Sequence, residues 1–194
     1  MLELLILFSA LFNQGDYLEG FVEQGRYIAP SRAFSVAIPT EAVGPHTLFE
    51  GENYVGFDND KKAFLFTQVI YKCEFESWEH FLEVSKDIYI PTYLENEPFE
   101  FLEHDTIFLN EHEVAYFVRL KVQKDSIGFL LVPNRDTLIV HQFRTTTNTL
   151  QSRQQLLAKL LPYSHTFQLN APLFSGLSMD RTFEGLDEDK EGGL

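Results

Sequence analysis

The sequence is poor in the residues and motifs that would assign it to a chemical class at once. Cys73 is the single cysteine among 194 residues, which excludes an intramolecular disulfide and a zinc site built on paired cysteines. No GxxxxGKS/T or GxGxxG segment occurs, so nucleotide and dinucleotide sites of the usual types have no support. The GxSxG turn of serine hydrolases is also missing. No cofactor is therefore expected, and a non-enzymatic role is favoured over an enzymatic one.

Basic residues are scarce. Lys and Arg total 15 against 29 Asp and Glu, a formal net charge of −14. This excess argues against nucleic acid and against anionic lipid as partners, because both need a net positive surface. The acid is unevenly spread: residues 74–113 hold 1 basic and 12 acidic residues, whereas residues 114–163 hold 7 basic and 2 acidic ones. The chain thus contains a strongly acidic block followed by a net basic stretch.

Long apolar runs are also lacking. The N-terminal run Leu4–Phe12 has nine residues, fewer than the roughly 20 that span a bilayer, so no integral membrane span is expected. Its length fits the core of a signal peptide, although no Lys or Arg precedes it and no small-x-small cleavage site follows. It fits equally a short amphipathic helix packed on the domain. The first interpretation places the protein in the periplasm or cell envelope, and the second in the cytoplasm.

Aromatic residues, in contrast, are abundant. The chain has 19 Phe and 8 Tyr, and 44% of its residues are hydrophobic. Large rings bury about 150–250 Å² each, so they can stabilise a core without disulfides. We expect one α+β domain over residues 26–172, preceded by the apolar segment within 1–25. Residues 173–194 are acidic and offer little to bury, which predicts a flexible tail.

Alternation of apolar and polar residues predicts strands over much of this domain. It is clearest in 114–122, where Arg119 and Lys121 alternate with valine and leucine. Short polar links at 123–126 and 133–136 favour antiparallel neighbours, because parallel crossovers need about a dozen residues or more. The expected fold is an antiparallel sheet of about six to eight strands flanked by helices.

Two helices are predicted from helical spacing, and a proline is expected to end each. The first follows the N-cap Ser77 and stops at Pro91. The second starts near Thr149 or Ser152, runs to Leu161 and is closed by Pro162. The apolar stripe of the first helix consists of Trp78, Phe81, Leu82, Ser85, Ile88 and Tyr89.

The order of these elements is informative. A strand pair ending in proline (RYIAPSRAFSVAIP) precedes a hairpin (YVGFDNDKKAFLFTQVIYK), an amphipathic helix (SWEHFLEVSKDIY), a meander and a C-terminal helix (LLAKLLPYSHTFQL). Over residues 26–169 this order resembles the PsbP-like superfamily, an α/β/α sandwich. The resemblance rests on the flanking segments Tyr27–Pro39 and Leu156–Leu169. It implies a non-enzymatic protein that binds another protein, often in the bacterial envelope or the thylakoid lumen, and it carries over no functional residue.

The cations of the basic stretch are the candidate partner-binding residues. They are Arg119, Lys121, Lys124, Arg135 and Arg144. Opposed to the acidic block, they would form a dipolar surface that orients a protein partner. The alternative is that the two surfaces neutralise each other through ordinary surface ion pairs.

Histidines beside carboxylates give a second, chemically different candidate. A hairpin could bring His104 and His112 together with nearby Glu or Asp as a divalent metal site. Neighbours on a strand point to opposite faces, which favours solvated side chains instead. His141, within TLIVHQF, is expected to be a hydrogen-bonded core or sheet histidine.

The predicted function is a non-catalytic protein-interaction or assembly factor of a bacterial cell envelope. It follows from the element order, the apolar N-terminal run and the lack of a catalytic motif. The alternative is a small-ligand- or metal-binding enzyme with its site between sheet and helix.

Overall fold

The computed structural model describes residues 20–39, 47–51, 53–59, 63–95, 97–111, 113–146 and 149–170. The predictions for the apolar run Leu4–Phe12, for the acidic tail 173–194 and for His112 lie outside the described residues.

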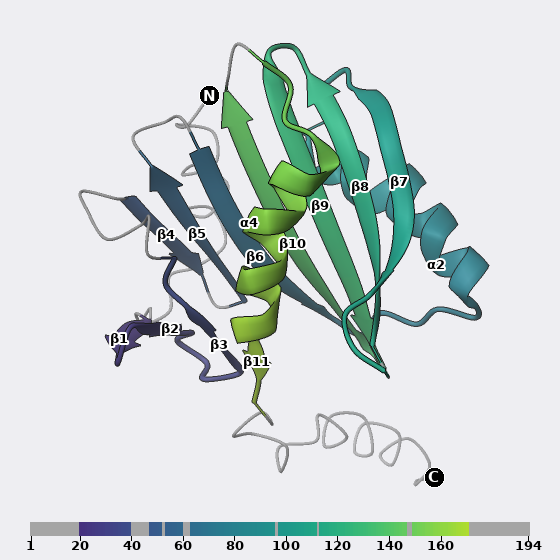
Figure 1. The fold of residues 1–194 in the computed structure, drawn as a ribbon. Helices are drawn as coiled ribbons and strands as arrows, with labels where there is room; N and C mark the ends of the chain where they lie inside the picture. Colours follow the sequence, from purple (N-terminus) through teal and green to yellow (C-terminus); the bar gives the residue numbers. More distant parts are fainter. Residues whose placement is uncertain are drawn as a thin grey trace, which may run out of the picture.

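The larger of two antiparallel sheets carries the fold (Figure 1). In the described part of the chain it has seven strands in the order β4-β5-β6-β10-β9-β8-β7. Strands β6, β10, β9, β8 and β7 follow one another as antiparallel neighbours, as the short polar links predict. The strand bounds are β4 Thr47–Gly51, β5 Tyr54–Asn59, β6 Ala63–Tyr71, β7 Glu100–Phe108, β8 Val114–Val122, β9 Asp125–Asn134 and β10 Thr137–Thr146.

A smaller sheet joins the two ends of the described chain. Its four strands lie in the order β1-β2-β3-β11, with bounds β1 Phe21–Glu23, β2 Arg26–Ile28, β3 Phe34–Ala37 and β11 Gln168–Leu169. The C-terminal strand β11 pairs with β3 through Gln168↔Ser35 and Leu169↔Phe34. This pairing fixes the end of the last helix to the N-terminal part of the domain.

Helices cover both faces of the large sheet. Figure 1 shows α4 crossing one face and α2 lying behind the other. Helix α4 spans Arg153–Thr166 and begins with a capping box between Ser152 and Gln155. On the opposite face, α2 (Trp78–Val84), the π-helical turn η2 (Ser85–Tyr89) and α3 (Ile90–Tyr93) form one continuous helix. The Ser77 hydroxyl accepts a hydrogen bond from the His80 N–H, which confirms the predicted N-cap.

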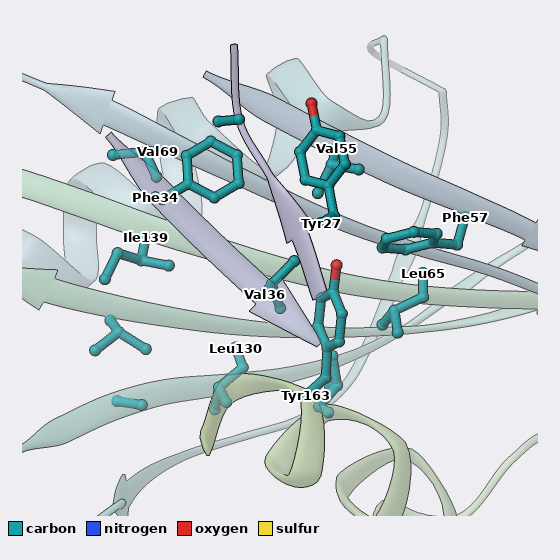
Figure 2. Close-up of a cluster of buried hydrophobic side chains, with 14 of the residues drawn as sticks. Tyr27, Phe34, Val36, Val55, Phe57, Leu65, Val69, Leu130, Ile139 and Tyr163 are labelled. Carbon is teal, nitrogen blue, oxygen red and sulfur yellow. The ribbon is translucent and has the colours of Figure 1, made fainter. Parts of the chain in front are cut away.

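Two apolar clusters result, one on each face of the large sheet. On the α4 side, Tyr27 and Phe34 of the small sheet, Val55 and Leu65 of the large sheet, and Tyr163 of α4 pack together (Figure 2). On the other side, the helix buries Phe81, Ile90 and Leu94 against a wall of sheet residues, which are Tyr116, Val118, Leu120, Phe129 and Leu131. The predicted α+β architecture, an antiparallel sheet flanked by helices, is therefore confirmed.

The predicted helix ends are wrong at both prolines. The first helix continues through Pro91 to Tyr93, and α4 continues through Pro162 to Thr166. The wide η2 turn ends at Tyr89, just before Ile90 and Pro91, and the Ile90 N–H bonds to the Ser85 carbonyl in an i→i−5 rather than an i→i−4 hydrogen bond. In α4, the buried Tyr163 packs edge-on against Phe57, so core packing holds the turn that contains the exposed Pro162. Tertiary contacts outweigh the local cost of proline at both places.

One glycine permits the close approach of α4 to the sheet. A Cβ added at Gly128 of β9 would lie 3.0 Å from the Leu160 Cδ1 and 3.2 Å from the Leu156 Cβ. Both leucines are fully buried in α4. The helix therefore packs directly on the β9 backbone at this point.

We expect Gly128→Ala to destabilise the protein by about 1–3 kcal/mol, because the extra methyl overpacks this contact. Leu160→Ala alone should cost about 2–5 kcal/mol. In the double variant the Gly128→Ala penalty should shrink, since the shortened side chain makes room. Urea unfolding of the four proteins measures this coupling, and strictly additive penalties would contradict the proposed contact.

Candidate functional site

The structure does not gather the predicted cations on one surface. Arg119 and Lys121 alternate with the inward residues of β8 and lie on the α4 side of the sheet, whereas Arg144 of β10 lies on the α2 side. Lys124 and Arg135 lie at opposite ends of β9, in the turns to β8 and β10. The five side chains are thus divided between two faces and two ends of the large sheet.

Three of these cations pair with carboxylates of the acidic block or its neighbours. The Arg119 Nε lies 3.3 Å from the Glu103 Oε2, and the Lys121 Nζ lies 3.9 Å from the Glu100 Oε2. The Arg144 Nε donates to the Asp125 Oδ2 at 2.6 Å, and its Nη2 lies 3.6 Å from the Glu97 Oε2.

Arg153, the first residue of α4, completes the pairing. Its guanidinium contacts Glu103 at 3.2 Å and Asp105 at 2.7 Å on the edge strand β7. This arginine was not among the predicted site residues. It joins the start of α4 to the edge of the sheet, so its evident role is in the fold.

Lys124 and Arg135 differ from the other three cations. Both are exposed, and within the described part of the chain neither forms an ion pair. They remain free to contact a partner, and binding through the five cations stays a prediction.

We expect Arg153→Ala to raise the pKa of Asp105 toward its usual value. The Arg153 side chain and then the Thr106 backbone N–H donate to that carboxylate and hold its pKa below the usual range. The stabilisation is present at neutral pH and fades as the pH falls and Asp105 is protonated. It should amount to less than about 1 kcal/mol, because the pair is largely exposed.

The measurement is a carboxyl NMR titration combined with urea unfolding. Lys121→Ala, which removes a longer ion pair, is the matched control and should leave the pKa of Asp105 unchanged. An unaltered Asp105 titration in Arg153→Ala would contradict the assignment.

The predicted metal site cannot be assembled from the described residues. The His104 ring packs edge-on against Tyr116, with 5.9 Å between ring centroids. No group of three His, Cys, Asp or Glu side chains converges as a metal site in the described ranges. His112 lies outside them, so the metal-binding alternative stays a prediction.

A second set of acids is left without basic partners. They are Glu74, Glu76, Glu79, Glu83, Asp87 and Glu95, all exposed and none in an ion pair with another described residue. Glu79 and Glu83 are one helical turn apart, where like charges destabilise a helix slightly. Within the acidic block, the carboxylates from Glu97 to Asp105 pair with cations, whereas those in and beside the α2–η2–α3 helix, like Glu111 beyond β7, form no ion pair with a described residue.

The π turn η2 shapes this helix surface. Phe81 and Ser85 are buried four residues apart, but the next buried residue is Ile90, five residues later. The extra residue leaves Lys86, Asp87 and Ile88 all exposed, and the side chain of Ile88 is 57% exposed. Its predicted place in the apolar stripe is therefore wrong, because the stripe assumed an uninterrupted period of 3.6 residues.

Two tyrosines anchor the inner side of the same turn. The Tyr89 hydroxyl lies 3.5 Å from the Cys73 Sγ, and burial followed by the Cys73 hydrogen bond raises the pKa of Tyr89 to about 12. The Tyr93 hydroxyl donates to the Gln68 Oε1 of β6 at 2.7 Å, and burial raises the pKa of this phenol as well. Both phenols stay neutral, and they hold the helix to β6 and to the segment that directly follows it.

We define the acidic helix face as Glu79, Glu83, Asp87 and Ile88. Lys86 is exposed beside it, but its ammonium lies 5.7 Å above the Phe101 ring, toward β7. The face therefore combines one exposed aliphatic side chain with three carboxylates that form no ion pair with another described residue.

Comparison with solved structures shows a PsbP-like fold. Cyanobacterial PsbP (CyanoP) from Synechocystis sp. PCC 6803 superposes with a TM-score of 0.52 at 12% identity, covering 83% of this chain and 99% of that one. A chain from Bacteroides thetaiotaomicron VPI-5482 gives a TM-score of 0.39 at 12% identity, covering 77% of this chain and 50% of that one. No family model and no curated protein matches the sequence. The similarity to PsbP confirms the expected fold and identifies no site residue.

Among the described residues, no helix is both long enough and apolar enough to cross a bilayer.

Proposed function

We propose that this protein is a non-catalytic interaction or assembly factor of a bacterial cell envelope and that it binds its protein partner through the acidic helix face. The observation that carries the proposal is Ile88, an aliphatic residue 57% exposed on a π turn, directly after Asp87. On the same helix, Glu79, Glu83 and Asp87 form no ion pair with another described residue. π turns of this kind are frequent at functional sites. The PsbP-like fold agrees with an accessory role, and the N-terminal apolar run supports the envelope.

The chemistry of the face defines the partner. An exposed isoleucine gains free energy when an apolar pocket removes it from water. The carboxylates of Glu79, Glu83 and Asp87 favour Lys and Arg around that pocket, and they steer the encounter from a distance. The complementary surface is therefore basic, with an apolar depression at its centre.

The test places a photoactivatable phenylalanine analogue at position 88 of the full chain in its native cells. We expect one discrete protein adduct after irradiation. Introducing Glu83→Lys and Asp87→Lys together should reduce its yield by about tenfold, because like charges then oppose each other across the interface. Raising the ionic strength during irradiation of a cell extract should weaken the adduct in the same direction.

Phe108 supplies the matched control. Its side chain is 75% exposed, on the edge strand β7 rather than on the helix. The analogue at position 108 should not give the same adduct. The proposal would be contradicted if both positions gave the same adduct. It would also be contradicted if the adduct yield at position 88 stayed the same after Glu83→Lys and Asp87→Lys.

We also expect Ile88→Ser to abolish the interaction while changing the free energy of unfolding by less than about 0.5 kcal/mol, since the residue is at the surface. Urea unfolding and co-purification of the partner identified by crosslinking measure the two effects. Phe108→Ser should leave the interaction intact. A large loss of stability in Ile88→Ser would show that the side chain serves the core instead.

A further inference from the structure

A histidine is enclosed between the large sheet and the C-terminal end of α4. His141 of β10 is 1% exposed, and its Nδ1 lies 2.7 Å from the Thr67 Oγ1 on the neighbouring strand β6. The rings of Tyr163 and Phe167 stand edge-on to the imidazole, with centroids at 5.6 and 5.5 Å. The sequence-based expectation of a hydrogen-bonded core histidine is confirmed, and the helix end forms its lid.

Among the residues that the structure describes, no negative charge faces His141. From α4 the titratable group facing it is the Tyr163 phenol, whose pKa burial raises and the Thr67 hydroxyl lowers in part. β6 contributes the neutral Thr67, and the small sheet contributes Tyr27 and Phe34 to the same buried cluster. Arg144, on the same strand, projects to the opposite face. A proton on the enclosed imidazole would therefore be a buried charge without a counter-ion.

The lid over His141 is held by a small number of polar contacts. The Arg26 Nη2 donates to the Thr166 carbonyl at 2.7 Å and to the Ser35 hydroxyl at 3.0 Å. The Ala37 N–H donates to the Thr166 hydroxyl at 3.3 Å, and β11 adds its short pairing with β3. Phe167 stacks on Phe34 at 5.5 Å between centroids. These contacts close the lid without contacting the imidazole nitrogens, and none of them is a backbone pairing within the large sheet.

We propose that His141 makes this lid an acid-sensitive latch, in which protonation of the imidazole favours release of the last turn of α4 and of β11 from the small sheet. The closed state excludes the proton, because the Thr67, Tyr163 and Phe167 enclosure gives the charged ring neither water nor an anion. The open state exposes the ring to water and accepts the proton at the ordinary pH for histidine. Falling pH therefore stabilises the open state relative to the closed one.

The direction and the size of the pH effect follow from the linkage between proton binding at His141 and opening of the lid. Burial lowers the pKa of His141 from 6.5 to about 3 in the closed state. Stability of the closed state is complete above about pH 6.5 and declines as the pH falls toward 3. Between pH 7 and pH 5 the equilibrium constant for opening should rise about 25-fold. Most surface carboxylates remain ionised over this interval, so their own titration interferes little.

Native-state hydrogen exchange on the full chain tests the latch. The opening constants of amides in 163–169 should rise about 25-fold from pH 7 to pH 5, after correction for intrinsic exchange. In the double variant Thr67→Val and His141→Phe, which removes both polar partners, the rise should disappear. His165→Gln is the matched control, because His165 is an exposed histidine of the same helix turn, and it should keep the wild-type response.

A direct titration keeps the test decisive if the double variant does not fold. In the native protein the imidazole signal of His141 should stay that of the neutral ring between pH 7 and pH 5. A His141 that titrates near 6.5 with the helix end still protected overturns the latch. An exchange rate that rises equally in the double variant overturns it too.

Discussion

Both faces of the seven-stranded sheet carry apolar side chains, and this requirement for two covering layers determines the rest of the structure. A sheet that is apolar on one face needs one layer, whereas this sheet buries Phe117 and Leu130 on one side and Val118 and Phe129 on the other. The C-terminal helix and the small sheet together cover the first face. The α2–η2–α3 helix covers the second face. Most of its inner residues must therefore be apolar side chains that pack against the sheet.

The outer residues of that helix are free from this requirement, and they carry the features that suggest a function. The cations of β8, β10 and α4 form ion pairs with the carboxylates from Glu97 to Asp105, in β7 and in the segment just before it. The carboxylates of Glu79, Glu83 and Asp87 receive no such partner among the described residues. Mutual neutralisation thus applies to the carboxylates from Glu97 to Asp105, and a charged partner surface stays a prediction.

Much of the fold could be predicted from the sequence, because strand alternation and short polar links leave few arrangements other than an antiparallel sheet. The N-cap at Ser77 and the buried His141 were also predictable from local pattern. The helix ends at Pro91 and Pro162 were not, since contacts of Tyr93 and Tyr163 with distant parts of the chain decide them. The exposure of Ile88 could not be predicted either, because the π turn contains one extra residue that changes the helical period. The composition of residues 85–89 does not indicate this extra residue.

Ile88 faces outward, and we expect a partner to cover it in the cell. The most direct measurement is the alkylation rate of a thiol introduced by Ile88→Cys, determined for the purified protein and in intact native cells with a membrane-permeant reagent. The buried Cys73 provides the slow internal reference. The account predicts rapid labelling of position 88 in the purified protein and strong protection in cells. Slow labelling of the purified protein, or equal labelling in both settings, would contradict it.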